Sequence, residues 1–93
     1  MSCEKIKSIV DSKDSIIVDV RTNVEFLRGH IKGAYTIPVD MIGSTINKLR
    51  DKNVYLYCQS GARSEHVRRF LEANNIHAFN MGGINNFIGC LEF

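Results

Sequence analysis

A short apolar run at residues 54–57 leads directly into Cys58 and a polar loop, after which the pattern changes to that of a helix. The valine, leucine and two tyrosines of this run are typical of a buried strand. The next apolar residues, Val67, Phe70 and Leu71, recur at the spacing of one helix face. The stretch therefore predicts a strand joined to a helix by a short loop, which is the building unit of α/β folds.

The polar loop places Cys58 where the helix would begin. The loop consists of Gln59, Ser60, Gly61, Ala62, Arg63 and Ser64. If it curls so that its backbone N–H groups point inward, they form an anion-binding nest around the sulfur at the positive end of the helix. Such surroundings lower the pKa of a cysteine below its usual value of about 8.5. We therefore predict that Cys58 is a nucleophile and that Gly61 supplies the unusual backbone angles of the curl.

The rest of the chain predicts helices that alternate with strands. Apolar spacing indicates helices at residues 4–10, 22–29, 38–50, 62–75 and 84–91, and strands at residues 16–20, 33–37 and 77–79. Thr22 and Glu25 form a capping box at the start of the second helix. The buried face of the last helix is expected to consist of Ile84, Phe87, Ile88 and Leu91. The short connections predict a small three-layer α/β fold, with a parallel sheet covered by helices on both faces, and one domain over residues 1–93.

Charged side chains follow the first strand at the edge of the sheet where the cysteine is expected. Asp19 and Arg21 stand at the carboxyl end of that strand, as Cys58 does on its own strand. In such sheets, ligands bind beyond the carboxyl ends of the strands. One rim of the sheet is therefore expected to gather the Cys58 thiolate with Asp19, Arg21, Glu25 and Arg63.

Charge balance and cysteine content exclude several classes of function. Lysine and arginine number 12 against 10 aspartates and glutamates, so we expect no nucleic-acid and no membrane-surface partner. No apolar run approaches the ~20 residues of a membrane-spanning helix. Cys3, Cys58 and Cys90 lie too far apart for a metal motif, and we expect no metal, no cofactor and no disulfide. The odd number of cysteines, together with an N-terminus that lacks an apolar leader, favours a reducing cytoplasm.

Four separated motifs resemble those of the rhodanese-like sulfurtransferase domain. They are Asp19-Val20-Arg21 with Glu25-Phe26, then residues 29–34 with Ile37-Pro38, then residues 57–64, and finally Gly82-Gly83-Ile84. The resemblance covers residues 14–90. It implies that Cys58 accepts a sulfane sulfur from a small donor, becomes a persulfide and passes the outer sulfur to a thiol or protein acceptor.

The resemblance also implies roles for the residues around the cysteine. Arg63 would hold the loop or the anionic donor, Arg21 and Glu25 would form a structural ion pair, and His30 would be a structural hydrogen-bonding residue. Asp19 is either a carboxylate that braces the loop or a plain acid at the strand end. Cys90 is either a small buried hydrophobe or a resolving thiol that attacks a Cys58 persulfide, and Cys3 is expected to be exposed.

Two alternatives stand beside sulfur transfer. Phosphatases of the same fold resemble this pattern but have five residues between cysteine and arginine, whereas only four residues separate Cys58 from Arg63. The shorter loop would form a smaller cradle, which suits one sulfur atom. A rhodanese-like domain can also persist as a binding module with an inert site, although inert members usually lack the cysteine.

Members specialised for thiosulfate often carry a basic residue after the cysteine. Because Gln59 and Ser60 stand there, we expect a low-molecular-weight persulfide to be a better donor than thiosulfate.

Overall fold

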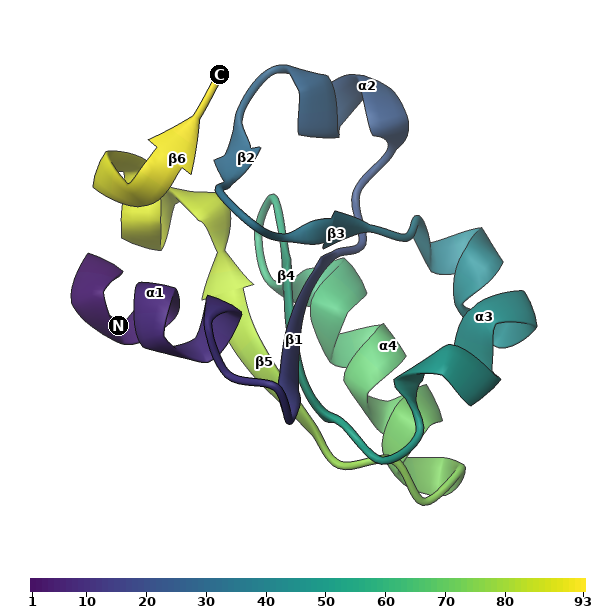
Figure 1. The fold of residues 1–93 in the computed structure, drawn as a ribbon. Helices are drawn as coiled ribbons and strands as arrows, with labels where there is room; N and C mark the ends of the chain where they lie inside the picture. The colour runs from purple at the N-terminus through teal and green to yellow at the C-terminus, as the bar shows by residue number, and fades with distance from the viewer.

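A parallel sheet with helices on both faces is the framework of the computed structural model, which describes residues 1–93 (Figure 1). Its strands are β1 (Ser15–Asp19), β3 (Tyr35–Thr36), β4 (Asn53–Cys58) and β5 (Ala78–Gly83), in the order β3-β1-β4-β5. The α-helices are α1 (Cys3–Val10), α2 (Asn23–Leu27), α3 (Ile42–Leu49) and α4 (Ala62–Ala73), and the 3-10 helices are η1 (Val39–Met41) and η2 (Ile84–Cys90). A separate antiparallel pair joins β2 (His30–Ile31) to β6 (Leu91–Glu92). The predicted α/β architecture is confirmed.

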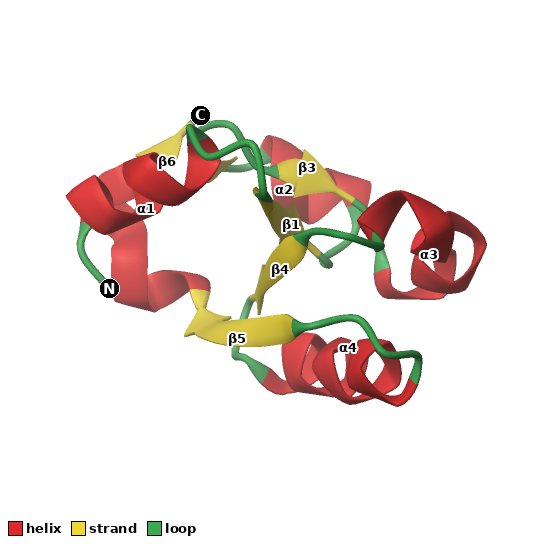
Figure 2. Ribbon diagram, turned by 60° about the horizontal axis from the view of Figure 1, so that its bottom comes forward, coloured by secondary structure: helices red, strands yellow, loops and turns green.

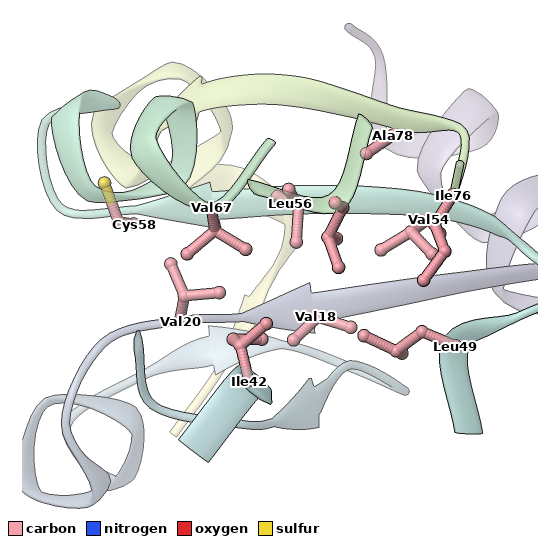
Figure 3. Packing of buried hydrophobic residues seen from close by; sticks show 11 residues of the cluster. Val18, Val20, Ile42, Leu49, Val54, Leu56, Cys58, Val67, Ile76 and Ala78 are labelled. Atoms are coloured by element: carbon pink, nitrogen blue, oxygen red, sulfur yellow. The ribbon is translucent and has the colours of Figure 1, made fainter. Parts of the chain in front are cut away.

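Successive side chains of β4 point to opposite faces of the sheet, and both faces are covered. Leu56 and Cys58 belong to the apolar cluster under α3 and α4, whereas Tyr57 belongs to a second cluster under α1 and η2. Figure 2 shows α1 and the C-terminal segment on one side of the sheet and α3 and α4 on the other. A strand that is buried on both faces has apolar residues at every position, which explains the continuous apolar run in the sequence. Cys58 lies at the end of its cluster where β4 meets the loop (Figure 3).

Two helix ends match the sequence prediction. The Glu25 N–H donates to Thr22 Oγ1 at 3.2 Å, and the Thr22 N–H donates to the Glu25 carboxylate at 3.0 Å, so the capping box of α2 is confirmed. At the end of α4, Asn75 adopts a left-handed conformation with a φ of 63°. The capping box also fixes Glu25 at the N-terminal end of α2.

The C-terminal segment differs from the amphipathic helix that the sequence predicts. Residues 84–90 form a 3-10 helix that is interrupted at Phe87, whose φ of −144° is not helical. Ile84 and Phe87 are buried as expected, but Ile88 is 58% exposed because the interruption turns it to the surface. The short strands β2 and β6 are not predicted either, since two residues are too few to establish a period.

Cys3 and Cys90 form a disulfide, so the prediction of no disulfide is wrong. Their Cα atoms lie 5.3 Å apart although 87 positions separate them in the sequence. The reason is that α1 and η2 pack together on one face of the sheet, a contact between the two ends of the chain that sequence spacing does not reveal. In this state Cys90 is neither a lone hydrophobe nor a free resolving thiol, and Cys58 is the only free cysteine.

Candidate active site

The loop between β4 and α4 wraps around the sulfur of Cys58. Gly61 is the N-cap residue of α4 and has a φ of 96°, so it supplies the left-handed angle that the sequence predicts. The Gly61 N–H donates to Cys58 Sγ at 3.0 Å, and the Ser64 N–H donates to it at 3.4 Å. The Ala62 N–H is not turned inward, because it donates to Ser60 Oγ at 3.3 Å. Two of the backbone N–H groups thus converge on the sulfur in the predicted manner.

The surroundings of Cys58 act on its thiol in opposite directions. Burial raises the pKa of Cys58 because it removes water from the thiolate, whereas hydrogen bonds from Ser64, Gly61 and Ser60 lower it. The hydrogen bonds outweigh burial, and the pKa of Cys58 lies below its ordinary value. The loop therefore favours the anionic sulfur that a nucleophile requires.

Arg63 makes a bidentate ion pair with Glu25. Its Nη1 and Nη2 atoms donate to the two carboxylate oxygens at 2.8 and 2.9 Å. The hydrogen bonds from Arg63 lower the pKa of Glu25 to about 2, although burial acts in the opposite direction. Glu25 therefore both caps α2 and anchors the first turn of α4. The expected ion pair between Arg21 and Glu25 is wrong, because Arg63 reaches Glu25 from across the site.

Arg21 pairs instead with Asp19 in the interior. Both side chains are buried, and Arg21 Nη2 lies 2.7 Å from an Asp19 carboxylate oxygen. Arg21 also donates to the carbonyl oxygen of Gly29 at 2.7 Å and to Gln59 Oε1 at 3.4 Å. Asp19 is therefore a brace and not a plain acid at the strand end. Through Arg21 it ties the end of β1 to the start of the cysteine loop.

Sequence reasoning misses Asn80, which holds the loop from β5. Asn80 Oδ1 accepts a hydrogen bond from Ser64 Oγ at 2.7 Å and another from the Gly82 N–H at 2.9 Å. Its Nδ2 group donates to the Gly61 carbonyl at 3.1 Å. A β-bulge in the pairing of β4 with β5 follows directly after Asn80. The one signal in the sequence is an asparagine within a strand, where this residue type is depleted.

The glycine pair at the end of β5 lets its backbone approach the loop closely. A Cβ atom on Gly83 would lie 2.7 Å from the carbonyl oxygen of Gln59, and one on Gly61 would lie 3.4 Å from backbone atoms of Gly82. A side chain at position 83 would therefore displace the loop. This contact explains why the motif at residues 82–84 belongs with the cysteine motif, although the two are far apart in sequence.

His30 has the structural role that was expected of it. Its Nδ1 atom lies 2.8 Å from the Phe26 carbonyl oxygen, and its ring stacks on the ring of Phe26. Its Nε2 atom lies 3.1 Å from a carboxylate oxygen of Glu92. Nearby, the Ile31 N–H donates to the hydroxyl of Tyr57 at 3.0 Å. These contacts hold β2, the segment after α2, beside β4 and the C-terminal strand β6.

A groove of about 520 Å³ lies beside the cysteine loop, and Gln59 and Arg28 are among its lining residues. The two other charged residues of its lining, Arg21 and Glu25, are each neutralised by an ion-pair partner. Arg28 is in no ion pair, so the side chains that line the groove carry a net positive charge, which suits an anionic ligand. No group of three or more histidine, cysteine or acidic side chains is placed to hold a metal ion. None of the helices is both long and apolar enough to cross a membrane.

Comparison with known proteins identifies the family. The sequence matches the rhodanese-like domain over residues 2–90. The chain belongs to the rhodanese-like family. Its structure is similar to a rhodanese-like domain protein from Staphylococcus aureus, with a TM-score of 0.77, 38% identity, and coverage of 91% of this chain and 86% of that one. A rhodanese-related protein from Thermoplasma volcanium has a TM-score of 0.78 at 25% identity, with 96% of this chain and 89% of that chain covered.

The curated relatives of this rhodanese-like chain differ in their activities. A sulfurtransferase from Allochromatium vinosum is 34% identical over 64 residues, which are 68% of this chain and 60% of that protein. A tRNA uridine(34) hydroxylase from Photorhabdus laumondii is 27% identical over 81 residues, which are 80% of this chain and 23% of that protein. The chain thus spans less than two thirds of the length of these relatives. The family includes sulfurtransferases and other enzymes.

Proposed function

We propose that this rhodanese-like chain, taken as one domain over residues 1–93, is a sulfurtransferase that carries a sulfane sulfur as a persulfide on Cys58. The observation that carries the proposal is the convergence of the Gly61 and Ser64 N–H groups on the Cys58 sulfur. Fixed N–H dipoles stabilise an anion without having to rearrange when the charge forms. Membership of the rhodanese-like family and the similarity to a sulfurtransferase support the same chemistry.

The transfer consists of two displacements at sulfur. In the first, the Cys58 thiolate attacks the sulfane sulfur of the donor, a sulfur–sulfur bond forms, and the remainder of the donor leaves with the electron pair. In the second, an acceptor thiolate attacks the outer sulfur of the persulfide, and Cys58 leaves as a thiolate. The sulfur anion lies within the loop before and after transfer. The N–H groups of the loop therefore act on both the nucleophile and the leaving group.

A low-molecular-weight persulfide fits the loop better than thiosulfate does. Thiosulfate has two negative charges, and Gln59 and Ser60 offer no positive charge next to Cys58. Arg63, the cation within the loop, is already neutralised by Glu25. Arg28, which is in no ion pair, lines the adjoining groove, and this position suits a donor with a carboxylate at a distance from its sulfur. We propose a thiol, either small or on a protein, as the acceptor.

A non-catalytic binding module is the second candidate, and the complete burial of Cys58 favours it. With no exposed surface on the sulfur, a donor reaches it only when the loop at residues 59–64 moves. In a binding module the same N–H groups would hold a small anion without any covalent change. The two candidates therefore differ in whether a sulfur atom becomes bonded to Cys58.

Intact-protein mass spectrometry after incubation with glutathione persulfide separates these candidates. With the Cys3–Cys90 disulfide intact, Cys58 is the only thiol that can react. We expect the protein to gain the mass of one sulfur atom and to lose it again on addition of excess thiol. The Cys58→Ser variant should gain nothing. A wild-type protein that remains unmodified while it still binds small anions would support the binding module and exclude the sulfurtransferase.

A further inference from the structure

The Cys3–Cys90 disulfide lies at the surface and away from the Cys58 site. Cys3 is the first residue of α1 and is exposed, while Cys90 is the last residue of η2 and is half-buried. Cys90 packs against the apolar cluster under α1, whereas Cys58 belongs to the cluster on the other face of the sheet. The pair is therefore not a resolving partner built into the Cys58 loop, and its function has to be sought separately.

A cavity of about 370 Å³ lies against the pair, and both cysteines line it. Lys7 and Lys32 also contribute to the lining, with Asp11 as the one acidic residue. Two cations against one anion leave a net positive charge beside the sulfur atoms, which attracts small anions such as persulfides and stabilises a thiolate. The cavity has room for a small molecule next to a sulfur–sulfur bond, which a purely structural crosslink does not need.

We propose that Cys3 and Cys90, in their reduced form, are an acceptor site that takes a sulfane sulfur from a small persulfide and releases it as sulfide. This activity goes beyond the proposed function, because the pair takes its sulfane sulfur from a small persulfide and not from Cys58. It does not depend on transfer through Cys58. The chemistry of the pair can be measured in the absence of Cys58.

The reaction balances in two steps. The Cys3 thiolate attacks the outer sulfur of a persulfide RSSH, which forms a Cys3 persulfide and releases the thiol RSH. The Cys90 thiolate then attacks Cys3 Sγ, forms the observed disulfide and expels the outer sulfur as hydrosulfide. In sum, two thiols and RSSH give one disulfide, RSH and H₂S, so the sulfane sulfur is reduced and the two cysteines are oxidised. A dithiol reductant such as dithiothreitol returns the pair to thiols.

The structure assigns the first attack to Cys3. Cys3 is exposed and lies in the first turn of an eight-residue helix, whose unpaired N–H groups favour negative charge. Cys90 is half-buried, with its Cα atom 5.3 Å from that of Cys3, which is a suitable distance for the second attack. The pair would thus have one entering thiol and one resolving thiol.

A single-turnover experiment in the Cys58→Ser background tests the proposal. The protein is reduced, freed of reductant and mixed with one equivalent of glutathione persulfide. We expect about one sulfide per protein and the loss of two hydrogen atoms from the protein mass. A Cys90→Ser variant in the same background should stop at the first step, with the mass of one sulfur atom added at Cys3 and no sulfide above background. A Cys3→Ser variant should react at least tenfold more slowly.

Protein whose thiols have been blocked with iodoacetamide gives the background of sulfide from the persulfide alone, and this control does not depend on the folding of any variant. Sulfide release equal to that background would overturn the proposal, as would an equal rate from the Cys3→Ser variant. Because Cys58 is absent throughout, neither result bears on transfer through Cys58. Conversely, failure of Cys58 to take up sulfur in the disulfide-bonded protein leaves the outcome for the pair unaffected.

Discussion

Replacement of Asn80 by alanine is expected to lower the pKa of Cys58, even though Asn80 does not touch the sulfur. The link is the single proton of the Ser64 hydroxyl, whose oxygen lies 2.7 Å from Asn80 Oδ1 and 3.4 Å from Cys58 Sγ. The orientation of the Asn80 amide is fixed, because Oδ1 accepts from the Gly82 N–H and Nδ2 donates to the Gly61 carbonyl. Oδ1 can therefore only accept, and it competes with the Cys58 thiolate for the hydroxyl proton.

The expected magnitude follows from that one hydrogen bond. Without Asn80, the acceptors left to the Ser64 hydroxyl are the Gly61 carbonyl at 3.1 Å and the thiolate at 3.4 Å. The charged sulfur is the stronger acceptor of the two, and a hydrogen bond to a charged group contributes about 1.5 kcal/mol. Since one pKa unit corresponds to about 1.4 kcal/mol, the pKa of Cys58 should fall by about one unit. The ion pairs that face the site are kept in this variant: Arg63 with Glu25, Arg21 with Asp19, and Glu65 with Arg68, although Glu65 loses its 3.3 Å hydrogen bond from Asn80 Nδ2. Of the atoms that Asn80 contacts, Ser64 Oγ is the one within hydrogen-bond distance of Cys58 Sγ, so the hydroxyl proton is the change that acts directly on the sulfur.

The ultraviolet absorbance of the thiolate, followed against pH, measures this shift. The disulfide-bonded protein is suitable because Cys58 is then its only free cysteine. The matched control is the same substitution in a Ser64→Ala background, where it should leave the Cys58 titration unchanged. Circular dichroism checks that each variant is folded. A rise in the pKa, or an equal fall with and without Ser64, would show that Asn80 acts through the shape of the loop, and the reasoning would be refuted.

Three further outcomes are expected. Gly83→Ala should lower Tm and abolish sulfur uptake at Cys58, because the Cβ of the alanine would lie 2.7 Å from the Gln59 carbonyl oxygen and displace the loop. Thermal melting measures the change in Tm, and mass spectrometry measures the sulfur uptake. The pKa of Glu25 falls from 4.5 to about 2 on folding, so the stability that this carboxylate contributes is present above pH 4.5 and is lost toward pH 2. Glu25→Gln should therefore flatten the dependence of Tm on pH between pH 4.5 and pH 2. Gln59→Lys should lower the KM for thiosulfate, more at low salt than at high salt, and should leave the KM for glutathione persulfide unchanged. Steady-state rates with both donors at two ionic strengths measure these KM values.

Local features of this protein could be read from the sequence. The apolar run of β4, the turn at Gly61 and the helical spacing of α4 each depend on residues within a few positions of one another. The capping box of Thr22 and Glu25 is local in the same way. Because backbone conformation and the burial of one face are governed by such short-range patterns, the strand–loop–helix unit around Cys58 was predictable.

The partners of the site residues are decided by the tertiary structure. Glu25 meets Arg63 across 38 positions, Asn80 meets Ser64 across 16, and Cys3 meets Cys90 across 87. The sequence places the two arginines and two carboxylates on one rim but does not determine which arginine binds which carboxylate. That choice depends on how α2 and α4 are oriented on the sheet, and side-chain hydrogen bonds form or fail over distances of a few tenths of an ångström.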